Sequence, residues 1–175
     1  MEQAKRPVSA VLAGPYGHPW HPILVTVPIG AWVASLVFDI GSYVVAEAGF
    51  LVAGSRWLIA IGVLGALAAA LVGLLDLFAI PLRTAAFRTG LTHMSINLLV
   101  TAAYVANFVW RGPGTDVAAG PLALSVASLI ALTVSGYLGG KLTYHYGVRV
   151  AAETTQAEGY RPREPSTPTT ESDPR

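Results

Sequence analysis

The sequence predicts an all-α integral membrane protein, an up-and-down bundle of four helices followed by a disordered C-terminal tail. Charged residues make up 12% of the 175 residues, against about 25% in an average soluble domain. The mean hydropathy is +0.55, and the apolar residues gather in four long runs. This composition is typical of a chain in a lipid bilayer, and the net charge of +1 gives no indication of nucleic-acid binding.

Four segments are long enough to cross a hydrocarbon core about 30 Å thick, which takes about 20 apolar residues of helix. They are approximately 22–46, 57–80, 91–110 and 121–146. Pro22 and Pro121 suit first-turn positions, where the missing N–H costs nothing. Pro28 lies inside the first segment and predicts a kink there.

The connections between these segments are short, which makes successive helices antiparallel neighbours. They comprise residues 47–56, 81–90 and 111–120. We therefore expect an N-terminal segment over 1–21, a four-helix domain over 22–146 and a tail over 147–175. The last 25 residues carry four prolines and eight charges with almost nothing apolar, a composition typical of disorder.

The positive residues predict the orientation. Four spans place both termini and the 81–90 connection on one side of the membrane. Nine Lys and Arg residues fall on that side, namely Lys5, Arg6, Arg83, Arg88, Lys141, Arg149, Arg161, Arg163 and Arg175. Arg56 and Arg111 fall on the other. The positive-inside rule then places both termini in the cytoplasm.

All four histidines are expected at the cytoplasmic end of the bundle, and they are joined there by one carboxylate. His18 and His21 precede the first span, His93 lies in the first turn of the third, and His145 lies in the last turn of the fourth. Asp76 lies about one turn from the cytoplasmic end of the second span. Every helix thus contributes one such group at a single membrane depth.

Helical spacing indicates that two of these groups face the bundle interior. Asp76 shares a face with small residues that allow close helix approach, and these are Gly62, Gly65, Ala69 and Gly73. His93 begins a polar stripe at i+3 and i+4 spacing that continues through Asn97, Thr101 and Tyr104. For Asp76 we expect Arg83 or His93 as a structural partner.

Asp39 is separate from this group. It lies 18 residues beyond His21, which corresponds to roughly 27 Å of helix, so it belongs near the opposite surface. The expected role is an interfacial carboxylate within reach of Arg56 or Asn107. The alternative is a proton or ion relay, since intramembrane carboxylates are often functional.

Three uses of the histidine cluster stay open. Two of the four imidazoles could ligate haem b in a four-helix bundle. The same histidines with Asp76 could instead hold a transition metal such as Zn or Cu. In the third use the cluster binds no cofactor and only stabilises the bundle, alone or as part of a partner-binding protein. Motifs of hydrolases, metalloproteases and nucleotide-binding enzymes are absent, so we predict binding or electron transfer rather than catalysis.

The stretch GHPWHPILVTVPIGAWVASLVFD resembles an uncharacterised bacterial membrane-protein family known as domain of unknown function 2231. Later elements fit it in order, namely GLLDL, RTGLTHMSINL and SGYLGGKLTYHYGVRV. The resemblance implies a four-helix protein of the bacterial inner membrane and carries over the same four histidines. Some relatives are joined to Rieske-type iron–sulfur domains, which implies membrane electron transfer with a redox partner or a quinone.

Two features of this chain depart from those relatives. Many of them carry a further histidine at the position of Thr26, beside a phenylalanine at the position of Val27. If that histidine is a ligand in the relatives, this chain lacks it. The chain also has no cysteine, so it cannot hold an iron–sulfur cluster in the usual way.

Overall fold

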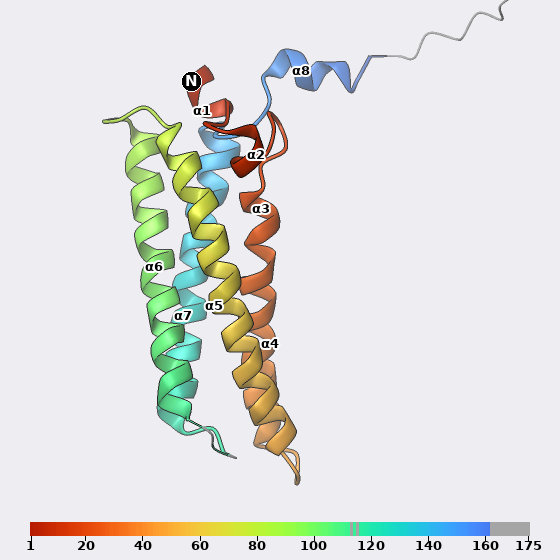
Figure 1. The fold of residues 1–175 in the computed structure, drawn as a ribbon, viewed down its shortest axis with the longest axis vertical. Coiled ribbons are helices and arrows are strands. Elements are labelled where there is room, and N and C mark those ends of the chain that lie inside the picture. Colours follow the sequence, from red (N-terminus) through yellow and green to blue (C-terminus); the bar gives the residue numbers. More distant parts are fainter. Residues whose placement is uncertain (113, 115, 162–175) are drawn as a thin grey trace, which may run out of the picture.

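A computed structural model describes residues 1–112, 114 and 116–161 of the chain. Four long helical segments run side by side, and short helices cover one end of them (Figure 1). The long segments are α4 (Thr26–Ser42) with the short α3 (His21–Leu24) before it, α5 (Gly49–Phe78), α6 (Ala85–Arg111), and α7 (Ala119–Gly140) extended by the π-helical turn η1 (Lys141–His145). The described residues therefore form an all-helical fold.

Three of these segments are long and apolar enough to cross a membrane: His21–Ser42, Gly49–Phe78 and Ala119–His145. The helix α6 has comparable length but a lower mean hydropathy. Each long helix packs on the next, and α4 also meets α7. The helices α4 and α6 therefore face each other diagonally across the bundle.

The helix bounds differ from the predicted ones at the end of the first helix, which is Ser42 rather than 46, and at two starts. The second helix begins at Gly49 rather than 57, because most of the predicted 47–56 loop is itself apolar and continues the helix. The third helix begins at Ala85 rather than 91. Its N-cap is Thr84, whose Oγ1 accepts a hydrogen bond of 3.1 Å from the N–H of Phe87, the usual stabilisation of a free N–H in a first turn.

The first helix is interrupted close to Pro28, the residue at which a kink was predicted. Helix α3 ends at Leu24 and α4 begins at Thr26, with Val25 between them. Pro28 has no N–H for the carbonyl four residues earlier, that of Leu24. Pro121 lies in the first turn of α7, as predicted.

A fully packed layer crosses the middle of the bundle. The rings of Trp32 and Tyr104 stack with centroids 4.1 Å apart and planes at 8°, and Ile59 and Val100 complete the buried cluster. The small-residue face of α5 permits this packing. A Cβ on Gly62 would come within 2.3 Å of the Trp32 indole nitrogen, so α4 and α5 approach closely there.

The two ends of the described chain meet over one end of the bundle. The helices α1 (Glu2–Lys5), α2 (Ala10–Ala13) and α8 (Glu153–Glu158) lie there (Figure 1). The first residues of the predicted tail are packed instead of disordered, since Val148 and Arg149 are 7% and 5% exposed. The backbone N–H of Arg149 donates to the carbonyl of Ala4 at 2.9 Å. Residues 162–175 of that tail lie outside the described residues.

Candidate functional site

A cavity of about 450 Å³ opens inside the bundle at the end that carries the terminal segments. Most of its wall is apolar, contributed by α3 to α7 and by η1. Its polar lining includes the side chains of His21, Asp76, His93, Asn97, Thr101, Thr143, Tyr144 and Arg149. A mostly apolar cavity with a few convergent polar groups is the usual form of a ligand site.

His21 enters this cavity from α3 and is held by α5. Its Nδ1 donates a hydrogen bond of 2.9 Å to the carbonyl of Ala69. In the neutral ring, Nε2 then carries the lone pair. Gly73 makes room for the ring, because a Cβ there would come within 2.9 Å of it.

His93 enters from α6 and is held by α7 in the same way. Its Nδ1 lies 2.8 Å from the carbonyl of Ser135, to which it donates. Its Nε2 accepts a hydrogen bond of 3.1 Å from the side-chain amide of Asn97. Gly139 makes room for this ring, as a Cβ there would come within 3.1 Å of it.

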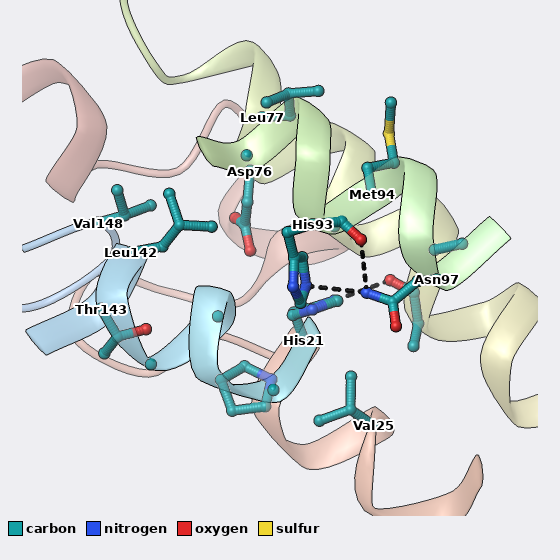
Figure 2. A pocket seen from close by; sticks show the side chains of 18 of the residues that line it. His21, Val25, Asp76, Leu77, His93, Met94, Asn97, Leu142, Thr143 and Val148 are labelled. Carbon is teal, nitrogen blue, oxygen red and sulfur yellow. Dashed lines mark hydrogen bonds between the residues drawn. The ribbon is translucent and has the colours of Figure 1, made fainter. Parts of the chain in front are cut away.

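The two imidazoles therefore meet between diagonally opposed helices. Their centroids are 6.2 Å apart and their planes make an angle of 76°. Figure 2 shows the two rings next to each other, with Asn97 beside them and Asp76 nearby. In each ring the Nδ1 proton is fixed by a backbone carbonyl, the bond that typically sets the tautomer and orientation of a ligating histidine.

Asp76 faces the cavity, but its partner is not one of those expected. Its Oδ1 lies 2.9 Å from Nε of Arg149, whereas Arg83 is exposed. The two atoms are at ion-pair distance without the geometry of a hydrogen bond. Among the described residues, three atoms have no hydrogen-bond partner: Oδ1 of Asp76, and Nε and Nη1 of Arg149. This end of the cavity thus holds both a free acceptor and free donors.

The other two histidines do not join this pair. His18 and His145 lie at the same end of the molecule, but both are exposed and neither contributes to the lining of the cavity. The ring of His145 packs against Tyr146, with centroids 4.9 Å apart. Within the described part of the chain, no group of three or more His, Asp or Glu side chains is arranged to hold a metal ion.

The family model described as "Predicted membrane protein (DUF2231)" matches residues 17–152. The chain belongs to this family. No curated protein and no solved structure shows significant similarity to it. The family match covers both histidines of the cavity and Arg149, so the whole site lies within the region that defines this membrane-protein family.

Asp39 lies at the opposite end, in a network of a different kind. Both of its oxygens accept hydrogen bonds of 2.6 Å from Arg111, and the side chain is fully buried. Among the described residues, Asp39 is paired with Arg111 and makes no hydrogen bond or ion pair with the expected partners, Arg56 and Asn107. Asn107 instead accepts a bond of 2.6 Å from Nε of Arg111, so the arginine joins the two.

The two arginines that complete these ion pairs, Arg111 and Arg149, were not among the predicted site residues. From the sequence, Arg111 was placed in the connection after the third span and Arg149 in the C-terminal tail. A signal for Arg111 was available, because it lies four residues beyond Asn107 and seven beyond Tyr104 on the polar stripe of α6. For Arg149 helical spacing offered no comparable signal, although the residue lies inside the family element SGYLGGKLTYHYGVRV.

Proposed function

We propose that the protein is a multi-pass protein of the bacterial inner membrane in which α6 is a fourth span. Its 27 residues correspond to about 40 Å of helix, which is enough to cross a bilayer. Two of the polar side chains that lower its hydropathy, those of Tyr104 and Asn107, face the bundle and are fully buried. Its lipid-facing side carries exposed apolar residues, among them Leu99, Val105 and Val109.

Both termini are proposed to lie in the cytoplasm. The end that carries the terminal segments is rich in Lys and Arg, whereas Arg56 and Arg111 lie at the other end, as the positive-inside rule requires. Topology reporters fused at residues 85 and 160 should report from the cytoplasm, and those at 50 and 115 from the periplasm. A reporter at 85 that is active on the periplasmic side would overturn both the fourth span and this orientation.

The proposed function is that of a small redox module that binds haem b between His21 and His93. The observation that carries it is the imidazole pair. Each ring presents Nε2 while Nδ1 is fixed, and the centroids are 6.2 Å apart. A metal–imidazole bond is about 2.0–2.1 Å for zinc, so two rings on one ion have centroids roughly 6 Å apart.

The surroundings of the pair suit a haem. The wall is mostly apolar, and the two histidines come from diagonally opposed helices, an arrangement used for cofactors in four-helix bundles. Asn97 must release Nε2 of His93, and its amide can keep its second bond, of 3.0 Å, to the His93 carbonyl. When bound, the haem supplies one-electron transfer with a redox partner or a quinone.

The test is the absorption spectrum of the detergent-purified protein after reconstitution with haem, oxidised and then reduced. The wild type should show a Soret band that shifts and sharpens on reduction. His21→Ala and His93→Ala should lose it, while His18→Ala and His145→Ala should keep it. These last two are matched controls, because both side chains are exposed at the same end of the molecule.

The same samples decide between the remaining functions. A colourless protein that does not take up haem would overturn the haem proposal. Stoichiometric Zn or Cu lost in the His21 and His93 variants would favour a transition-metal site of two imidazoles. No metal and no haem, with lower stability in both variants, would leave the pair as a structural element of the bundle.

A further inference from the structure

The guanidinium of Arg149 is the least satisfied charged group in the described part of the cavity wall. The side chain is buried, and Nη2 donates to the carbonyls of Ala13 and Gly14 at 2.9 and 2.8 Å. Its Nε faces Asp76 at 2.9 Å. An arginine has five N–H donors, so the two hydrogens of Nη1 are left, and no described residue accepts either of them.

The fold holds this guanidinium in place with an unfavourable backbone conformation. Arg149 adopts a left-handed backbone with φ of 61°, which is unfavourable for a residue other than glycine. Both terminal segments fix it there, through the Ala4 carbonyl on its backbone and the carbonyls of the 13–14 turn on its side chain. Strained residues that their surroundings hold in this way are frequent at ligand sites.

Arg149 is one of the residues that line the cavity, and its Nη1 atom is buried in the wall. The cavity is long and polar at one end. On α7 and η1 its lining extends from Leu132 to Tyr144, twelve residues that correspond to roughly 18 Å of helix. Arg149 and Asp76 lie at the terminal end, and Trp32 and Leu132 lie toward the middle of the bundle. An occupant of this cavity should therefore be largely apolar, with an acceptor oxygen at one edge.

We infer that Nη1 of Arg149 receives a carboxylate of the cofactor, so that the site selects a porphyrin that carries free propionate groups. This inference rests on the proposed haem site and names the group that recognises the edge of the haem. Charge–charge hydrogen bonds between arginine and carboxylates are among the strongest in proteins. The negative charge of Asp76 neutralises Arg149, and the added carboxylate is balanced by the net positive core of a ferric porphyrin.

The experiment compares two probes on the full-length protein in detergent, ferric haem b and its propionate dimethyl ester. Esterification keeps the iron and the macrocycle but removes both carboxylates. The wild type should bind the ester roughly tenfold to a hundredfold more weakly, the range for a hydrogen bond to a charged group. In Arg149→Gln this ratio should fall to about one. The matched control is Arg88→Gln, an exposed arginine at the same end, which should keep the wild-type ratio.

Asp76→Asn tests the inference without removing Arg149, in case Arg149→Gln does not fold. Loss of the neighbouring carboxylate leaves Arg149 uncompensated, so the preference for the free acid should rise. Equal binding of the two probes by the wild type, or an unchanged ratio in Arg149→Gln, would overturn the role of Arg149 and leave the haem site standing. If the wild type binds neither probe, both proposals fail.

Discussion

The two ends of the bundle each contain an aspartate paired with an arginine, but the pairs are built differently. At one end Arg111 makes two bonds of 2.6 Å to Asp39 and further bonds to Asn107, Ser55 and Ser125. At the other end Arg149 approaches Asp76 at 2.9 Å without hydrogen-bond geometry. One pair is saturated by the protein, whereas the other has donors and an acceptor to spare.

The surroundings of each pair match this difference. The side chains of Asp39 and Arg111 are 0% and 4% exposed, and neither residue lines the 450 Å³ cavity. Asp76 is 13% exposed and borders the 450 Å³ cavity together with the two imidazoles. Between the ends lies the Trp32–Tyr104 stack, which separates the two polar regions. The Asp39 end therefore has the features of a purely structural ion pair, and the Asp76 end is where we propose that a ligand binds.

The largest effect on stability is expected when the arginine of the saturated pair is removed, and this variant tests the difference between the two pairs. Arg111→Met leaves the carboxylate of Asp39 buried without a partner, which typically costs about 3–5 kcal/mol. The measurement is the free energy of unfolding in mixed micelles. Haem affinity of the protein that remains folded should not change, because Arg111 lies at the other end.

Arg149→Met is the control for this prediction. Asp76 keeps contact with the cavity, so the loss of unfolding free energy should be clearly smaller, about 1–3 kcal/mol for the groups left unpaired. If the two variants lost the same amount, the distinction between a structural ion pair and a ligand site would have no energetic basis.

A second test concerns the central layer between the two ends, where α4 and α5 approach closely. In Gly62→Ala the new methyl group would lie within 2.3 Å of the Trp32 indole, and such overpacking costs about 1–3 kcal/mol. In the matched control, Gly136→Ala, an added Cβ meets nothing within 4 Å, so stability should stay within about 0.5 kcal/mol. Thermal unfolding of both variants decides this. A tolerated alanine at position 62 would show that the central layer is loosely packed.

Much of this architecture could be predicted from the sequence, because membrane helices are specified by length and apolarity. Four helical segments occur in the predicted order, although only three of them are long and apolar enough to span a membrane and two begin earlier than predicted. The interruption near Pro28 and the inward direction of Asp76 and His93 agree with the prediction. The small residues from Gly62 to Gly73 also lie where their spacing indicated, against α3 and α4. Periodicity works well inside a regular helix, where 3.6 residues per turn fix the direction of every side chain.

The predictions failed where the helices lose that regularity. Depth follows from position along the chain, so His18 and His145 are at the expected end. The direction of their side chains does not follow from position along the chain, because His18 precedes the first helix and His145 ends a π-helical turn. In that turn the N–H of Tyr146 bonds to the carbonyl of Lys141, five residues earlier. This spacing shifts the helical phase, and His145 is exposed instead of facing the cavity.

The smallest expected effect concerns Asn97. It tests whether the hydrogen bond from Asn97 to His93 weakens the binding of the proposed haem. The amide of Asn97 occupies Nε2 of His93 at 3.1 Å, so a cofactor has to displace it. A hydrogen bond contributes about 0.5–1.5 kcal/mol net, and its removal in Asn97→Ala should raise haem affinity about twofold to tenfold. Equilibrium titration of the apoprotein, followed at the Soret band, measures this.

Thr101→Ala is the matched control for Asn97→Ala. This hydroxyl also lines the cavity, but it donates to the Asn97 carbonyl on its own helix, so its loss should leave the affinity unchanged. A weaker affinity in Asn97→Ala would mean that the amide supports the ligated form of His93 and does not compete with it. A pair of imidazoles closed by a removable amide is what separates a ligand site from the saturated network around Arg111, where no bond can be released without leaving a buried charge.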